Sequence, residues 1–330
     1  MLDRYQAPDK LTGRIDSSTD SSAFRWHQII QPINLNQSVD LDNSFLNICF
    51  LGFCCDEGVK RNMGRPGAAN GPASIRQEMA NWPANCLPHA QLFDAGNIIC
   101  DDDNLEEAQE ALAVAVKIII DQGFFPILLG GGHEIALGHF NGILRAKQSA
   151  PAIINFDAHL DLRPVIDKGS SGTMFNQIHQ ICKNDNLDFN YLCIGPQTYA
   201  NTQSLFAKAD EIGTEYILAK EISQNSLEKV NGIIQKYVAD KNQVYLTLCT
   251  DVLSAAHAPG VSAVQPFGLD SELVLQLIKE IIKTGKVCSI DFAEVSPRFD
   301  ADNRTAKLVA VYIYAVINSL IELHINLSST

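Results

Sequence analysis

The feature that most constrains the fold is a regular alternation of short apolar runs with longer amphipathic ones. The short runs have the length and β-branched character of buried parallel strands, and they span residues 46–53, 125–129, 152–156, 191–194, 244–248 and 287–292. Helical patterns occupy residues 105–122, 133–145, 201–209, 226–240, 271–284 and 305–323. This alternation predicts a three-layer α/β/α sandwich with a mainly parallel, doubly wound sheet.

The alternation reaches the end of the chain without a linker that would divide it, and α/β sheets of this size routinely fold as one domain. The beginning of the chain is different, because it is polar and rich in turn-forming residues, with the run SSTDSS at residues 17–22. We therefore expect residues 1–44 to form a partly flexible extension and residues 45–330 to form one α/β domain.

Charge and cysteine usage limit the partners and the compartment. The net charge of -13 opposes binding to nucleic acid or anionic lipid, so an anionic small molecule would need a local basic pocket. The nine cysteines have no paired spacing, which favours reduced thiols, and no secretory signal or confident membrane span is apparent. We expect a cytoplasmic homo-oligomer that acts on a small-molecule anionic substrate, with neither nucleic acid nor membrane as a partner.

Residues that follow the predicted strands are the candidates for chemistry, because ligands of such sheets bind beyond the carboxyl ends of the strands. The sequence GGGHE follows residues 125–129, and its glycines allow a tight turn that brings His133 to the sheet edge. By itself, a histidine after such a turn is more often a cap or a core residue than a ligand.

Three potential ligands follow the next strand at alternating positions, namely Asp157, His159 and Asp161. Side chains two residues apart on an extended segment point the same way. Burying them unpaired would be very costly, whereas a divalent cation neutralises such a cluster. The alternative is a solvated turn.

Two later strands end in similar chemistry. One is followed by Cys249 and Asp251, and the other contains Glu294 in the run AEVSP. Four strand ends therefore bring carboxylates, two imidazoles and one thiol toward one edge. Such a mixture suits Mn, Fe or Zn, and a two-metal cluster is its natural occupant.

These segments carry a family resemblance over most of the chain. In order, GGGHE, DAHLD, CTD with APGVSA, and AEVSP resemble the metal-binding and substrate-binding signatures of the arginase-like ureohydrolases. The stretch DEGVKRNMGRPGA at residues 56–68 and the loop SGTMF at residues 171–175 are most similar to formimidoylglutamases. In that loop, Phe175 stands where arginases carry a histidine.

The resemblance implies a metal-dependent hydrolase of a linear amidine. Its reaction would convert N-formimidoyl-L-glutamate and water to L-glutamate and formamide, a step of histidine degradation. One alternative is another guanidino or amidino hydrolase, of arginase or agmatinase type. A second alternative is a metal-poor, non-catalytic homologue.

The resemblance also implies a ligand set. One metal ion would lie on His133, Asp157, Asp161 and position 249, and a second on Asp157, His159, Asp251 and position 249. That shared position is normally aspartate, and here it is Cys249. A thiolate can bridge two cations but is softer than a carboxylate, which disfavours Mn relative to Zn or Fe. We expect one or two divalent ions, Mn by resemblance and Zn or Fe given Cys249; if Cys249 is inert, the site holds one ion or none.

Catalytic roles follow from the same resemblance and fall on Asp251, Glu294 and His159. Asp251 would take a proton from water and pass it to the leaving amine. Glu294 would pair with the cationic amidine through charge-assisted hydrogen bonds.

The two carboxylates of the implied substrate require positive charge near the site. Lys60, Arg61, Arg65 and Arg163 are the candidates, and Asn62 is a further candidate contact. Arg65 is favoured because a guanidinium binds a carboxylate in bidentate fashion.

Overall fold

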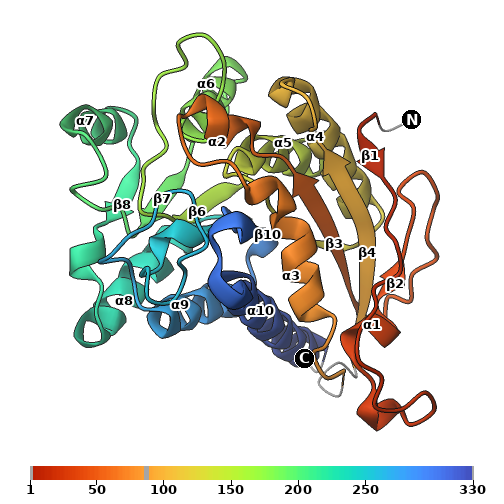
Figure 1. The fold of residues 1–330 in the computed structure, drawn as a ribbon. Coiled ribbons are helices and arrows are strands. Elements are labelled where there is room, and N and C mark those ends of the chain that lie inside the picture. The colour runs from red at the N-terminus through yellow and green to blue at the C-terminus, as the bar shows by residue number, and fades with distance from the viewer. Residues whose placement is uncertain (1–2, 85–88, 329–330) are drawn as a thin grey trace.

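The computed structural model describes residues 3–84 and 89–328 (Figure 1). Its strands are β1 (Tyr5–Gln6), β2 (Gln31–Pro32), β3 (Leu46–Cys54), β4 (Ala90–Ile99), β5 (Phe125–Leu129), β6 (Ala152–Phe156), β7 (Tyr191–Ile194), β8 (Glu215–Ile217), β9 (Val244–Cys249) and β10 (Val287–Ala293). Its α-helices are α1 (Trp26–Ile29), α2 (Glu57–Arg61), α3 (Gly71–Met79), α4 (Leu105–Asp121), α5 (Ile135–Lys147), α6 (Met174–Asn184), α7 (Gln203–Glu211), α8 (Leu227–Val238), α9 (Ser271–Lys283) and α10 (Arg304–Ser328).

All of these strands join one sheet in the order β1-β4-β3-β5-β10-β9-β6-β7-β8, and β2 pairs with β4 beside this path. The pairing of β1 with β4 is antiparallel, and the pairings along the rest of the sheet are parallel. β9 and β10 come last in the chain but lie between β5 and β6. Parallel pairing sets the carboxyl ends of these four strands side by side at one edge.

Helices cover both faces of the sheet, which completes the three layers (Figure 1). α3, α8, α9 and α10 contribute to the core on one face, and α4, α5, α6 and α7 contribute to the core on the other. The predicted α/β/α sandwich with its mainly parallel sheet is therefore confirmed.

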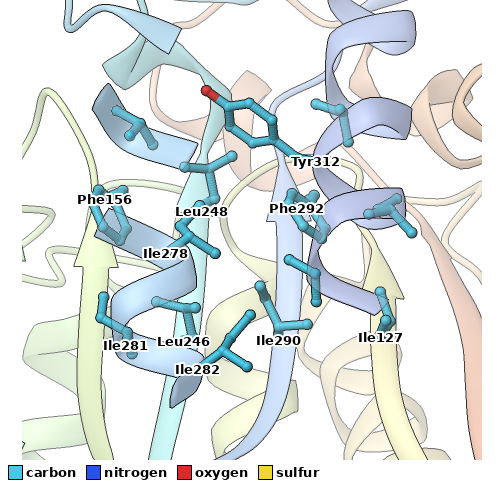
Figure 2. Packing of buried hydrophobic residues seen from close by; sticks show 14 of the residues in the cluster. Ile127, Phe156, Leu246, Leu248, Ile278, Ile281, Ile282, Ile290, Phe292 and Tyr312 are labelled. Carbon is cyan, nitrogen blue, oxygen red and sulfur yellow. The ribbon is translucent and has the colours of Figure 1, made fainter. Parts of the chain in front are cut away.

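The packing of one face is shown in Figure 2. Aliphatic side chains of α9, among them Ile278 and Ile282, meet Leu246 of β9 and Ile290 of β10 in one buried cluster. Burying each side chain of this size contributes about 1.5–3 kcal/mol to folding. The central strands are thus anchored by packing just below the edge that carries the candidate site.

The C-terminal helix belongs to this core. The segment Ala301–Leu327, which covers all of α10 except its last residue, is long and apolar enough to cross a membrane by length and composition. However, 56% of its most apolar window is buried inside the molecule, and α10 packs against α3 and α9. A core helix accounts for this apolar character.

Strand β4 was not apparent from the apolar pattern because it carries Asp94 and Asn97. Asp94 is buried and accepts hydrogen bonds from Nε and Nη2 of Arg76 at 2.7 and 2.9 Å. Arg76 Nη1 donates to Asn97 Oδ1 at 2.7 Å. A buried ion pair therefore interrupts the hydrophobic run by which a central strand is usually found.

The segment before β3 is attached to the same sheet. Through β1 and β2 it pairs with β4, and Trp26 of α1 is fully buried against Phe50 and Tyr314, with ring centroids 6.4 and 5.8 Å away. Partial flexibility of residues 1–44 stays a prediction, as does their separation from one domain at 45–330.

The burial of Trp26 predicts that Trp26→Ala lowers the free energy of unfolding by about 3–5 kcal/mol, because a large cavity would open between α1 and the sheet. Urea unfolding followed by circular dichroism measures this change. Ile15→Ala is the matched control, since Ile15 of the same segment is 64% exposed and should change stability by less than about 0.5 kcal/mol. Equal stabilities of the two variants would show that the segment is not part of the cooperative core.

Candidate metal centre

A glycine loop places His133 at the carboxyl end of β5. Gly130 N donates to Phe292 O at 2.7 Å, Gly132 N donates to Cys55 O at 2.8 Å, and Glu294 N donates to Gly131 O at 2.8 Å. A Cβ atom on Gly131 would lie only 1.8 Å from Cys55 O, so only glycine permits this approach of two main chains. The loop is thereby fixed between the ends of β3 and β10.

His133 is the centre of several contacts. Its Nδ1 lies 2.9 Å from Asp157 Oδ2 and 3.1 Å from Asp161 Oδ2. Its Nε2 lies 3.0 Å from Thr247 Oγ1, and its main-chain N–H donates to Glu294 Oε1 at 2.9 Å. The ring is therefore oriented with Nδ1 toward the carboxylates that follow β6.

A second set of contacts surrounds His159. Its Nδ1 lies 3.2 Å from Asp251 Oδ2 and 3.4 Å from Asp157 Oδ1, and its main-chain N–H donates to Asp157 Oδ1 at 2.8 Å. Asp157 thus contacts both histidines, one with each carboxylate oxygen. It is fully buried and lies between the two sets.

Cys249 ends β9 and is 2% exposed. Potential ligand atoms of His133, Asp157 and Cys249 lie within 4.8 Å of one another, and those of Asp157, His159 and Asp251 form a second group by the same measure. Five of the six sequence-predicted ligands fall in these groups, which share Asp157. Asp161 is in neither group but contacts His133, and Cys249 is in the first group only, not in both as predicted.

Three carboxylate oxygens at this edge are buried without a hydrogen-bond partner within the described residues: Asp251 Oδ1, Glu294 Oε2 and, beside the glycine loop, Glu134 Oε2. Asp161 and Glu294 also adopt left-handed backbone conformations, with φ of 49° and 68°. Such conformations cost about 1–3 kcal/mol and persist where the surroundings impose them. Both features mark the edge as a site for a ligand rather than as a satisfied core.

The pKa values of the cluster show how negative charge accumulates there. Burial, together with the charge of Asp157, raises the pKa of Asp161 to about 6, and burial also raises the pKa of Glu294 well above its usual range. Burial opposes charge on His133 and His159, yet the neighbouring aspartates outweigh it and raise the pKa of both imidazoles. Positive charge is therefore favoured at this place.

The Cys249 thiol lies in the same negative electrostatic environment. Burial and the carboxylates of Asp157 and Asp251 raise its pKa well above the ordinary value. The thiolate becomes favourable only when a cation lies beside it. The donor set of carboxylates, two imidazoles and one thiol fits divalent transition metals, because carboxylates alone would suit Mg or Ca better.

A cavity of about 320 Å³ opens above this edge. Of the predicted site residues it is lined by His133, His159, Asp161, Cys249, Asp251, Glu294, Asn62, Arg65 and Arg163. Asp157 lies behind these residues. The cavity therefore joins the acidic edge of the sheet to a rim that carries two guanidinium groups.

The two rim arginines are held differently. Arg65 Nε donates to Ser262 O at 2.8 Å, its Nη2 donates to Val261 O at 2.7 Å, and its guanidinium lies over the ring of Phe299. Only Nη1 of Arg65 lacks a partner in the described part of the chain, so the bidentate fork that favoured Arg65 is largely occupied.

Arg163, in contrast, has a guanidinium with no partner among residues 3–84 and 89–328. Its side chain and the amide of Asn62 both lie against Gly172, where a Cβ atom would come within 2.9 Å of Arg163 and 3.0 Å of Asn62. The glycine of the loop after β6 thus makes room for two polar groups at the cavity.

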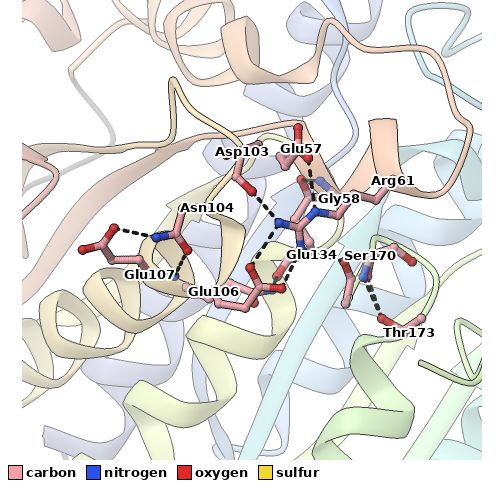
Figure 3. Close-up of polar contacts among 12 residues, drawn as sticks. Glu57, Gly58, Arg61, Asp103, Asn104, Glu106, Glu107, Glu134, Ser170 and Thr173 are labelled. Carbon is pink, nitrogen blue, oxygen red and sulfur yellow. Dashed lines mark hydrogen bonds and ion pairs between the residues drawn. The ribbon is translucent and has the colours of Figure 1, made fainter. Parts of the chain in front are cut away.

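The other two candidate cations do not line the cavity. Arg61 donates to Glu57 Oε1 at 3.1 Å, to Glu106 Oε1 at 2.6 Å and to Asp103 O, so its guanidinium ties α2 to the start of α4 (Figure 3). Lys60 is exposed and pairs with Glu57 at 3.0 Å. Both are accounted for by contacts within the fold.

Sequence reasoning missed Thr247, and it singled out Phe175 without predicting that its ring supports a ligand. Thr247 lies between His133 and Asp291, and Phe175 is buried in α6 with its ring edge-on to His133 at a centroid distance of 5.6 Å. Phe175 therefore packs behind the metal centre and does not line the cavity. Thr247, two residues before Cys249 on β9, was the available signal, because alternate strand residues share a face.

Comparison with known proteins agrees with this geometry. The sequence model of the arginase family matches residues 46–318. A formimidoylglutamase of Clostridium tetani is 48% identical over 320 residues, covering 94% of each chain, and one of Ralstonia nicotianae is 39% identical over 319 residues, covering 95% of this chain and 96% of that one. The protein belongs to the arginase family.

Solved structures show the same fold. Formimidoylglutamase from Bacillus subtilis superposes with a TM-score of 0.79 at 21% identity, covering 94% of this chain and 96% of that one. Trypanosoma cruzi formiminoglutamase with Mn2+2 superposes with a TM-score of 0.74 at 24% identity, covering 86% and 96%.

Proposed function

We propose that this protein hydrolyses N-formimidoyl-L-glutamate to L-glutamate and formamide with the help of divalent metal ions. The observation that carries the proposal is the paired ligand groups sharing Asp157, set beneath a cavity with Arg163 at its rim. The formimidoylglutamase relatives, at up to 48% identity over nearly the full chain, support the choice of substrate.

His133, Asp157, Asp161, Cys249, His159 and Asp251 would hold the metal ions. Ions bound there supply Lewis acidity and lower the pKa of water toward neutrality. The structure fits this role because Asp251 Oδ1 is buried with no partner among the described residues, and because the cluster carries an excess of acidic groups. Mn is the metal that the resemblance implies, and Cys249 favours Zn or Fe.

Proton transfer falls to Asp251 in this proposal. Asp251 lines the cavity, and His159 Nδ1 contacts its Oδ2, so Oδ1, which has no partner in the described chain, would take a proton from water. The same oxygen then returns the proton to the leaving nitrogen as the tetrahedral carbon collapses. Formamide and the amine of glutamate are the products.

Glu294 binds the amidine. Its Oε1 is held by the His133 main-chain N–H, its Oε2 has no partner in the described chain, and the residue lines the cavity. An amidinium N–H would give Oε2 a charge-assisted hydrogen bond. A cationic amidine also favours the ionised carboxylate, which burial otherwise opposes.

The rim binds the two carboxylates of the substrate. Arg163 and the Asn62 amide line the cavity with donors that have no partner in the described part of the chain. Arg65 adds Nη1, while its other nitrogens stay on the main chain of residues 261–262. An acidic protein can thereby accept a dianionic substrate through a small local patch. Cytoplasmic location and a homo-oligomeric state are further expectations.

The first test of the proposal is substrate choice. Purified protein loaded separately with Mn, Zn or Fe should release formamide from N-formimidoyl-L-glutamate and should turn over arginine and agmatine at least about 100-fold less efficiently, which corresponds to about 2.7 kcal/mol in the transition state. Faster release of urea from arginine would identify another guanidino hydrolase. Metal binding without turnover of any of the three substrates would favour a non-catalytic homologue. That alternative rests on Cys249, which replaces the aspartate usual at this position.

Arg163→Gln should raise KM for N-formimidoyl-L-glutamate about 10- to 100-fold, as expected for a lost charged hydrogen bond. The kcat should change little, because the carboxylate contact is equal in ground and transition states. Lys60→Gln is the matched control, since it removes one positive charge outside the cavity. A similar rise of KM in both variants would indicate general electrostatic attraction instead of a contact by Arg163.

Cys249→Asp should raise Mn affinity about tenfold, because a bridging carboxylate replaces a soft thiol with two hard oxygen donors. Activity with Mn should rise in parallel, and affinity for Zn should fall. Competitive titration with a metal-binding dye measures the two affinities, and formamide release measures the activity. Cys182→Ala, which removes a buried thiol in α6, is the control, and unchanged affinities in Cys249→Asp would show that Cys249 is not a ligand.

A further inference from the structure

A chain of buried polar groups extends from His133 away from the cavity and into the sheet. His133 Nε2 lies 3.0 Å from Thr247 Oγ1, and Thr247 donates from Oγ1 to Asp291 Oδ1 at 2.6 Å. Asp291 Oδ2 lies 2.6 Å from His139 Nδ1 and also accepts from the Tyr245 hydroxyl. All five side chains are buried, and none of the roles proposed above uses the last four.

Counting protons fixes the direction of these hydrogen bonds. Asp291 accepts the hydroxyl hydrogen bonds of Thr247 and Tyr245, one on each carboxylate oxygen. The one hydroxyl proton of Thr247 is therefore committed to Asp291. Thr247 Oγ1 can then only accept from His133, which places a proton on Nε2.

We propose that Asp291 is a positioning residue that acts through Thr247 to make Nδ1 the metal-binding atom of His133. The inference rests on the proposed metal-dependent function. With Nε2 bound to Thr247, Nδ1 is the nitrogen that faces Asp157 and Asp161. Phe175 also packs edge-on against the ring, so the imidazole is held by the hydrogen bond of Nε2 and by this aromatic contact.

The sheet itself sets this geometry. Thr247 and Asp291 are register partners on the neighbouring parallel strands β9 and β10, so their side chains project from the same face of the sheet. Asp291 is anchored from behind, because His139 Nε2 lies 2.5 Å from Ser289 Oγ, which donates to Pro126 O of β5 at 3.2 Å. Three adjacent strands thereby share in orienting one ligand.

The test is zinc binding to the full-length protein freed of metal, followed by isothermal titration calorimetry. Thr247→Val keeps the shape of the side chain and removes the hydroxyl, and it should weaken Zn binding about 10- to 100-fold, the range found for partners of metal-binding histidines. Thr247→Ser restores the hydroxyl and should bind within about threefold of wild type. Thr214→Val is the control, because its buried hydroxyl has no partner within the described residues. Equal Zn affinity of Thr247→Val and wild type would overturn the inference.

A second measurement does not depend on the folding of Thr247→Val. In Zn-loaded wild-type protein labelled with ¹⁵N-histidine, the resonances lost in His133→Asn should show a protonated Nε2 and a metal-bound Nδ1. A proton on Nδ1, or metal on Nε2, would refute the positioning role of Asp291. Failure of wild-type protein to bind Zn, Mn or Fe would instead refute the proposed metal-dependent function.

Discussion

Repulsion among buried carboxylates is the interaction on which the rest of the site depends. Asp157, Asp161, Asp251 and Glu294 are all less than a tenth exposed, and two imidazoles offset only part of their charge. Burying like charges together is costly unless protons or cations intervene. The pKa values of Asp161 and Glu294 are raised by burial and by neighbouring carboxylates, which shows that a further negative charge is unfavourable there. Ions at the same place would relieve the repulsion, so metal binding and stability of this edge are coupled.

The scaffold that tolerates this charge is assembled from rigid parts. The ligands follow β5, β6 and β9, and Glu294 follows β10, so each side chain is fixed by a strand whose other residues lie in the core. The glycine loop closes the gap between β3 and β10, and the left-handed conformations at Asp161 and Glu294 aim two carboxylates that an extended chain would direct elsewhere. Precision at the edge is thus bought with backbone strain and with glycines that no larger residue could replace.

Sequence reasoning identified much of this because the site follows a rule of parallel sheets. Strand ends that carry Asp157, His159 and Asp251 were recognisable from runs of apolar residues, and the structure brings those side chains together. Sequence reasoning did not reveal β4. Asp94 of this strand is buried in a pair with Arg76 of α3, and a contact between two separate elements cannot be seen in the apolar pattern of either one.

The candidate cations for substrate binding were also not distinguishable from the sequence. Arg65 and Arg61 have the same side chain and lie four residues apart, yet one reaches the cavity and the other binds α4. Composition and spacing cannot separate them, since only tertiary contacts decide which nitrogens remain free. Thr247 was missed for a related reason: a threonine within a strand is ordinary until its partners across the sheet are known.

The order of strands has a consequence for biosynthesis. β5 and β6 are synthesised before β9 and β10, which fill the places between them in the sheet. Until then the nascent sheet has two open edges and an incomplete set of ligands, with His133 and Asp157 present and Asp251 absent. The central pairing can therefore close only after β10 has left the ribosome. A chain truncated before β9 would keep most of its helices and both open edges, which makes it a client for chaperones and proteases rather than a partial enzyme.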